Sequence, residues 1–159
     1  VEYGEDSAAV LLGRELAKNC STNLEVVQQV YYWMQKNLRY DPQKAERMEG
    51  QPLLDTPDLD SVLESGKGIC IDFAVLAATM LRANGVPCQL VLGEADIPGG
   101  DTILHAWNMV WLEEEGTIHG DVSARADAWN RIDLTLAAAD ALSYKPLSED
   151  TVYHPASEH

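Results

Sequence analysis

Hydrophobic residues in the first part of the chain recur at intervals of three and four, the spacing that places side chains on one face of a helix. Segment 22–38 shows this pattern, and Thr22 and Glu25 stand at its start with the spacing of a capping box. Its apolar positions are Leu24, Val27, Tyr31, Met34 and Leu38. Pro42 ends this helix, because the residue before a proline resists helical geometry. A shorter amphipathic helix is predicted over 7–17.

The middle of the chain predicts a loop and then a long helix. The polar segment 43–60 contains two prolines and is expected to be mostly loop, with a short helix over 59–64. A second core helix is predicted from Cys70, with one buried stripe formed by Phe73, Leu76, Ala77, Met80 and Leu81. The Asn-Gly-Val-Pro sequence at 84–87 ends that helix.

The periodicity changes to that of strands after the long helix. Strands are predicted over 88–92, 104–111 and 129–135, and a last edge strand is expected within 144–153. The third strand would present on one face Trp129, Arg131, Asp133 and Thr135. Helices followed by strands predict an α+β fold, in which helices pack on an antiparallel sheet.

Composition limits the domain count and the partners. The chain has 159 residues, 46% of them hydrophobic, so we expect a single domain over 1–159 with its core at roughly 22–136. A net charge of −15, from 11 basic and 26 acidic residues, argues against nucleic acid and anionic membranes as partners. No run of 18 apolar residues occurs, so no membrane insertion is expected within this fragment. The chain begins at Val1, and any signal segment is expected to lie outside it.

The three cysteines, Cys20, Cys70 and Cys88, do not indicate a metal site. No two of them have CxxC spacing and no HExxH pair occurs, so a structural zinc ion is not expected. A disulfide between Cys20 and Cys88, leaving Cys70 reduced, would be compatible with an oxidising compartment.

Cys70 directly follows a glycine-containing turn at the start of the long predicted helix. The helix dipole and the first-turn N–H groups favour the thiolate, which is the reactive form of cysteine. The same N–H groups can bind the oxyanion that forms when a carbonyl is attacked. Gly66 and Gly68 leave space for a substrate near the sulfur. Taken alone, Cys70 fits equally well as a small buried residue, because free cysteine is often fully buried.

A nucleophilic thiol needs a base, and His105 on the second predicted strand is the best placed histidine. The other three histidines lie in a turn or in the tail. Asp133 lies between two apolar residues of the third predicted strand, where an unpaired carboxylate would be costly to bury. We therefore expect Asp133 to orient His105. Asp121 and Asp127 are competing candidates, although solvation in a turn explains both.

The chain resembles the transglutaminase-like superfamily in three ordered blocks. These blocks are "SGKGICIDFAVLAATMLRANGVP", "HAW" and "WNRIDLT", preceded by the similar upstream segment "VYYWMQKNLRYDPQKA". The resemblance covers roughly 24–135. It implies a papain-like core, with Cys70 as nucleophile at a helix N-terminus, His105 as base and Asp133 as orienting acid. It implies no metal and no organic cofactor.

The resemblance also gives expectations for neighbouring residues. Trp107 and Trp129 would pack beside the histidine and the aspartate, and Trp107 would also shield the histidine. Tyr40 would be the second donor to the oxyanion. Two departures from the family pattern concern the third block: Asp133 lacks the proline that often follows it, and the connection 116–128 is lengthened. Cys88 occupies a position where a small residue is usual, which favours a packing role.

The expected activity is thiol-dependent acyl transfer on peptide or protein amides. Of the two possible reactions, hydrolysis is expected rather than cross-linking, because the chain is most similar to bacterial transglutaminase-like domains. The alternative is a non-catalytic module that keeps the fold and binds peptide or cell-wall ligands. Those bacterial domains are often parts of secreted or envelope proteins, which implies an extracytoplasmic location within a larger surface protein; a cytoplasmic location is also compatible with the sequence.

Overall fold

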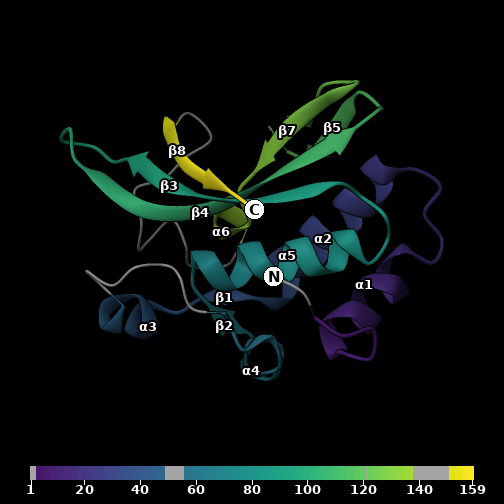
Figure 1. Ribbon diagram of the computed structural model, residues 1–159, viewed down its shortest axis with the longest axis horizontal. Coiled ribbons are helices and arrows are strands. Elements are labelled where there is room, and N and C mark those ends of the chain that lie inside the picture. Colours follow the sequence, from purple (N-terminus) through teal and green to yellow (C-terminus); the bar gives the residue numbers. More distant parts are fainter. Residues whose placement is uncertain (1–2, 49–55, 121, 138–150) are drawn as a thin grey trace.

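The structure has a layer of helices on one side and an antiparallel sheet on the other (Figure 1). The computed structural model describes residues 3–48, 56–120, 122–137 and 151–159. This arrangement confirms the α+β fold class that the order of predicted helices and strands indicated.

The first two helices begin at the residues that the sequence pattern predicts. α1 (Ala8–Ala17) follows Ser7, and α2 (Asn23–Asn37) follows Thr22. Both cap side chains accept a hydrogen bond from a first-turn N–H, at 3.3 and 3.1 Å respectively. The caps satisfy donors that have no acceptor within the helix.

Residues 43–47 are helical, so the prediction of a loop over 43–60 is wrong there. Asp41 accepts a hydrogen bond from the backbone N–H of Lys44 at 3.1 Å, and Pro42 takes the first position of α3 (Pro42–Arg47). A proline is well tolerated at that position, because its missing N–H would have no partner in the helix. The predicted short helix is present as α4 (Leu59–Ser65). Residues 49–55 of the predicted loop lie outside the described residues.

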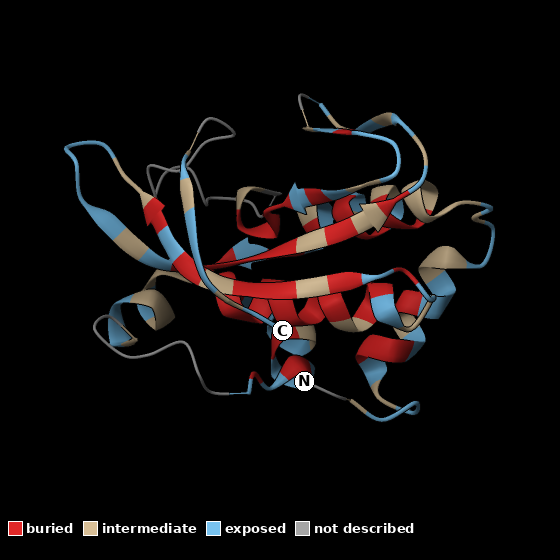
Figure 2. Ribbon diagram, turned by 45° about the horizontal axis from the view of Figure 1, so that its top comes forward, coloured by how far each residue is buried: buried red, intermediate tan, exposed pale blue. Residues whose placement is uncertain are grey.

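α5 (Cys70–Arg82) is the central helix, and it is buried on almost every side (Figure 2). The predicted apolar stripe is buried, but so are neighbouring residues such as Val75 and Ala78. α1 packs closely on α5, since a Cβ at Gly13 would lie 2.8 Å from the Cα of Met80. A helix covered on several sides shows no single apolar stripe.

The main sheet has four antiparallel strands in the order β7-β4-β3-β8. Their bounds are β3 (Cys88–Asp96), β4 (Thr102–Leu112), β7 (Ala128–Ile132) and β8 (Tyr153–Glu158). The third predicted strand ends at Ile132 rather than at residue 135. Thr135 belongs to the short helix α6 (Leu134–Ala137), so it does not extend the predicted strand face.

The tail strand lies further along the chain than predicted. It begins at Tyr153, where the prediction has it end, and pairs with β3. Residues 144–150 of the predicted strand lie outside the described residues.

The connection 116–128 contains a hairpin that the sequence analysis reads as a turn. Its strands are β5 (Gly116–His119) and β6 (Val122–Ala124), and it packs on α2. Gln28 donates a hydrogen bond to the carbonyl oxygen of Thr117 at 2.7 Å, and the rings of His119 and Tyr31 stack with centroids 5.3 Å apart. His119 therefore has a packing role.

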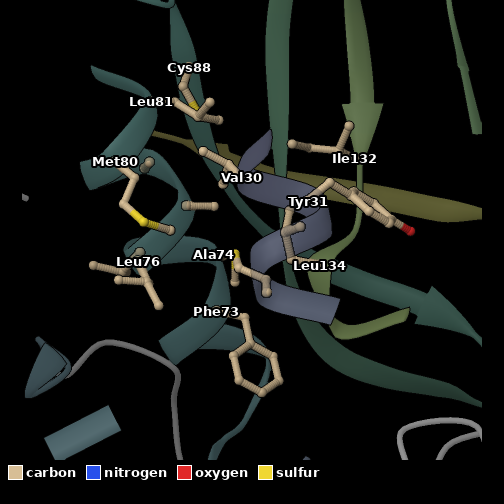
Figure 3. Close-up of a cluster of buried hydrophobic side chains, with 14 of the residues drawn as sticks. Val30, Tyr31, Phe73, Ala74, Leu76, Met80, Leu81, Cys88, Ile132 and Leu134 are labelled. Atoms are coloured by element: carbon tan, nitrogen blue, oxygen red, sulfur yellow. The ribbon is translucent and has the colours of Figure 1, made fainter. Parts of the chain in front are cut away.

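The hydrophobic core lies between α2, α5 and the sheet (Figure 3). Val30 from α2, Leu81 from α5 and Ile132 from β7 belong to this core, each almost fully buried. Burial of each such side chain contributes about 1.5–3 kcal/mol. Asn108 of β4 also faces the helices and donates a hydrogen bond to the carbonyl oxygen of Ala74 at 2.9 Å, which fixes α5 against the sheet. None of the helices in the described part of the chain is both long and apolar enough to cross a membrane.

Candidate active site

A short parallel strand pair leads the chain into α5. β1 (Arg39–Tyr40) follows α2, β2 (Lys67–Gly68) precedes α5, and the pairing places Tyr40 opposite Gly68. Asp41 donates its backbone N–H to the carbonyl oxygen of Gly68 at 2.8 Å. The end of one core helix is thereby joined to the start of the helix that carries Cys70.

The start of α5 is fixed by a buried carboxylate. Oδ2 of Asp72 accepts hydrogen bonds from the backbone N–H of Ile69 at 2.9 Å and from Nζ of Lys44 at 2.7 Å. A Cβ at Gly68 would lie 2.9 Å from the Cβ of Asp72, so the turn before the helix requires a glycine. Asp72 is almost fully buried, and the Lys44 ammonium compensates its charge.

Cys70 is the first residue of α5, and its thiol interacts with the side chain of His105. Cys70 is 2% exposed and His105 is 0% exposed. Nε2 of His105 is held by Asp133, so Nδ1 is the ring nitrogen that remains for the thiol. The structure has no well-aligned hydrogen bond at Nδ1, so the interaction with the sulfur is loosely aligned. Such contacts often tighten only when a substrate is bound.

Asp133 follows the last residue of β7 and directly precedes α6. Its Oδ2 lies 2.7 Å from Nε2 of His105, and both groups are buried. The same oxygen accepts a hydrogen bond from the hydroxyl of Tyr153 at 2.7 Å, while Oδ1 accepts one from the backbone N–H of Thr135 at 3.1 Å. The hydrogen bond predicted between Asp133 and His105 is therefore present.

The charges of this pair stabilise each other. Burial alone would lower the pKa of His105, but the charge and hydrogen bond of Asp133, and after them the hydrogen bond and negative charge of the Cys70 sulfur, raise it to about 10. Burial alone would raise the pKa of Asp133, whereas the His105 ring and the two further donors lower it. At neutral pH the imidazole is therefore protonated and the carboxylate ionised. An ionised carboxylate only accepts hydrogen bonds, so Nε2–H is the donor.

Aromatic side chains enclose the imidazole. Trp107 is stacked with His105 at a centroid distance of 6.1 Å, which agrees with the predicted position of Trp107 beside the histidine. The ring of Tyr153 lies 6.0 Å from that of His105 and meets Trp107 edge-on at 4.8 Å. Trp129 does not join this cluster; it is exposed and pairs with Trp111.

The competing residues of the sequence analysis lie elsewhere. Asp127 is exposed in a turn, with a positive φ of 51°, and Asp121 lies outside the described residues. His154 pairs with Asp96 on the surface at 2.8 Å, and His159 contacts Ser157. Tyr40 is buried beside the turn that precedes Cys70.

Tyr153 is a polar residue of the site that was not predicted from the sequence, as are Asp72 and Lys44 at the start of α5. It belongs to the tail, where neither alternation nor a motif distinguishes it from the other polar residues. The contact joins residues 20 positions apart. Only a known strand order would have indicated it.

The other two cysteines have packing environments. All three cysteines lie in the described part of the chain and form no disulfide, so the Cys20–Cys88 bond considered from the sequence is absent. Burial raises the pKa of Cys88 to about 12, although Arg82 and Asn108 act in the opposite direction. Burial and Glu25 raise the pKa of Cys20. Across the residues that the structure describes, no three His, Cys, Asp or Glu side chains are grouped so that they could hold a metal ion.

Comparisons with known proteins identify the family of the chain. The profile of the transglutaminase-like superfamily matches residues 11–132. Human kyphoscoliosis peptidase is 30% identical over 106 residues, which are 62% of this chain and 15% of the length of that protein. The chain thus matches only a small part of this curated relative.

Solved structures of other proteins share the fold. The periplasmic domain of TgpA from Pseudomonas aeruginosa has a TM-score of 0.56 at 20% identity, with 86% of this chain and 45% of that chain covered. A proposed cysteine protease from Cytophaga hutchinsonii has a TM-score of 0.53 at 16% identity, with 94% and 48% covered. These likenesses support the papain-like core with its antiparallel sheet. The family match extends over most of the chain and includes Cys70 and His105, and the chain belongs to the transglutaminase-like superfamily.

Proposed function

We propose that the domain is a thiol-dependent acyl-transfer enzyme, with Cys70 as nucleophile, His105 as general base and acid, and Asp133 as orienting carboxylate. The observation that carries the proposal is the buried 2.7 Å hydrogen bond between His105 and Asp133, next to a thiol at a helix start. Burying an ion pair is costly unless its geometry is excellent. A histidine that only packs in the core would not need a buried carboxylate as its partner.

In the first half-reaction the Cys70 sulfur attacks the carbonyl carbon of an amide. A C–S bond forms, the carbonyl electron pair moves to oxygen, and collapse of this oxyanion expels the amine. His105 holds the proton that came from the thiol and gives it to the leaving nitrogen. The raised pKa of His105 supports this role, because the ring carries a proton at neutral pH. The product is a thioester on Cys70.

In the second half-reaction water attacks the thioester while His105 removes its proton. The C–S bond breaks, the thiol regains a proton, and a carboxylic acid is released. A lysine amine in place of water would give a cross-link. These steps use only groups of the protein and the substrate, so the proposal includes no cofactor.

The oxyanion would lie at the N-terminus of α5. First-turn N–H groups of a helix have no acceptor within the helix and point toward developing negative charge. Tyr40 is the proposed second donor, because β1 pairing holds it opposite Gly68, two residues before Cys70.

Hydrolysis of peptide or protein amides is the form of the reaction that we favour. The curated relative is named a peptidase, and Cys70 and His105 are both deeply buried. A site with this little access suits water as the acceptor better than a bulky protein amine.

The same burial favours a second candidate, a binding module that keeps the fold without turnover. A nucleophile that is 2% exposed must become accessible before it can react. Under this alternative the His105–Asp133 pair would only stabilise the fold, and the domain would present its cleft to a peptide or cell-wall ligand.

We also propose that the domain acts outside the cytoplasm as part of a larger surface protein. The likeness to a periplasmic domain and the small share of longer proteins that the chain matches support this proposal. Fractionation of cells that express the full-length protein would test it, because the protein should be found outside the cytoplasmic fraction.

Covalent trapping tests the enzymatic proposal against the binding module. Iodoacetamide at neutral pH should alkylate Cys70 faster than Cys20 and Cys88, whose thiol pKa values are raised. With peptide amides as substrates, mass spectrometry of the intact protein should detect an acyl adduct on Cys70. Hydrolysis of this adduct should release the corresponding acid. Equally slow alkylation of all three cysteines, with no adduct, would support the binding module.

A further inference from the structure

The C-terminal strand brings a further polar side chain to the site. Tyr153 is the first residue of β8, which pairs with β3 at one edge of the sheet, whereas Asp133 follows β7 at the other edge. Neighbouring strands are about 4.8 Å apart, so two strands separate the two residues. The hydroxyl nevertheless reaches Oδ2 of Asp133 at 2.7 Å. The tyrosine side chain therefore extends across the sheet.

A glycine on β3 allows this close arrangement. Gly93 is paired with His105 on one side and with Pro155 on the other. A Cβ at position 93 would lie 2.3 Å from the carbonyl oxygen of His154 and 3.0 Å from Cη2 of Trp107. Any side chain at this position would force β8 and the Trp107 ring away from β3.

The ring of Tyr153 is held by three other groups. Trp107 meets it edge-on at 4.8 Å with 61° between the planes, and His105 lies 6.0 Å away. The guanidinium of Arg131 lies over the ring at 4.1 Å from its centroid, a favourable cation–π arrangement. The hydroxyl is therefore held in one direction, toward Asp133.

The Tyr153 hydroxyl completes the set of donors around the Asp133 carboxylate. Oδ2 accepts from both Nε2 of His105 and the phenol, and Oδ1 accepts from the backbone of Thr135. The phenol is one of the groups that lower the pKa of Asp133, after burial has raised it and His105 has lowered it. Without the phenol the carboxylate would keep only one donor on each oxygen, and less would prevent its rotation.

We propose that Tyr153 is a positioning residue: its hydroxyl fixes the Asp133 carboxylate so that Oδ2 stays aligned with Nε2 of His105, and its ring shields that hydrogen bond from water. This role deepens the proposed function and rests on it for its effect on turnover. The superfamily match ends at residue 132, so Tyr153 lies outside the part of the chain that the family pattern describes.

Tyr153→Phe tests the proposal, because it removes the hydroxyl and keeps the ring between Trp107 and Arg131. Loss of a hydrogen bond to a charged group should lower kcat about tenfold or more, with KM nearly unchanged. The Nε2–H proton of His105, observed by proton NMR at low field, should move upfield and broaden as its hydrogen bond weakens. Tyr32→Phe is the matched control, because Tyr32 is exposed on α2, and it should change neither quantity.

The outcomes separate this proposal from the proposed function. A Tyr153→Phe variant with wild-type kcat and an unchanged His105 resonance would overturn the positioning role. A variant that melts at lower temperature but keeps the resonance would overturn it too, since Tyr153 would then serve stability alone. If the wild type turns over no peptide amide, the enzymatic proposal fails, and the resonance alone still decides whether Tyr153 holds Asp133.

Discussion

Nε2 of His105 lies 2.7 Å from Oδ2 of Asp133, and neither side chain has more than marginal contact with solvent. The two residues come from adjacent strands: β4 carries the histidine, and the aspartate stands just beyond the end of β7. Ile132 and Leu134, on either side of the aspartate, point into the core. A shift of register by one residue would place the carboxylate among these apolar side chains, so the pairing and the register support each other.

Cys70→Ala should abolish turnover and leave the domain folded. Removal of the sulfur takes away the nucleophile, while a change this small in the core costs about 1 kcal/mol. Turnover of peptide amides and thermal unfolding followed by circular dichroism would measure the two effects. Cys88→Ala is the matched control, because that buried thiol packs beside Asn108 and should be dispensable for turnover. Full activity in Cys70→Ala would contradict the enzymatic proposal.

Asp133→Asn should lower turnover strongly and leave the fold largely intact. The amide has a similar shape but lacks the negative charge that orients the ring and stabilises the imidazolium. By analogy with the Ser-His-Asp triad we expect a loss in kcat on the order of 10⁴-fold. Asp127→Asn, in an exposed turn, is the control and should keep normal rates. Normal turnover in Asp133→Asn would remove the aspartate from the proposed mechanism.

Stability should decline with rising pH above neutrality. The pKa of His105 is raised from 6.5 to about 10, so the ring binds its proton more tightly in the folded state than in the unfolded state. This contribution is fully present below pH 6.5 and is lost as the pH rises toward 10. The pKa of Asp133 is lowered from 3.8, so its contribution is present above that pH and is lost on further acidification.

Urea unfolding at a series of pH values would measure this dependence. The wild type should lose free energy of unfolding between pH 6.5 and 10, whereas His105→Gln should show a flatter profile there. Turnover should fall over the same alkaline range, because the proton needed by the leaving amine is lost. Identical profiles for the two proteins would show that the titration of His105 does not contribute to the stability of the fold in this pH range.

Helical periodicity predicted α2 and α5 well because each has enough turns for the apolar interval to repeat. Shorter elements lack that signal. α3 depends on the pair Asp41-Pro42, which reads equally as the end of one helix or the start of another. The four- and three-residue strands of the β5–β6 hairpin are too short for alternation to be distinguished from a turn.

Motif chemistry predicted the part of the site that lies on those long elements. Cys70 stands at a helix start and His105 in a long strand, and the buried position of Asp133 was predicted from its apolar neighbours. Tyr153 was not predicted, because its contact depends on which strand occupies the edge beside β3. That order is a tertiary property and leaves no periodic trace in the tail.

Gly93→Ala should separate β8 from β3 and weaken the site from a distance. The new methyl group would lie 2.3 Å from the carbonyl oxygen of His154 and 3.0 Å from the Cα of Pro155, and these are backbone atoms that cannot rotate away. Forcing an extra methyl group into a packed region costs about 1–3 kcal/mol. Hydrogen exchange should therefore be faster for the amides of β8, and kcat should fall toward that of Tyr153→Phe, because the tyrosine moves with its strand. Gly4→Ala, at a position with no atom within 4 Å of the added carbon, should change neither quantity. Wild-type exchange in β8 of the Gly93→Ala protein would mean that β8 accommodates the methyl group without moving, and that the position of Tyr153 does not depend on this glycine.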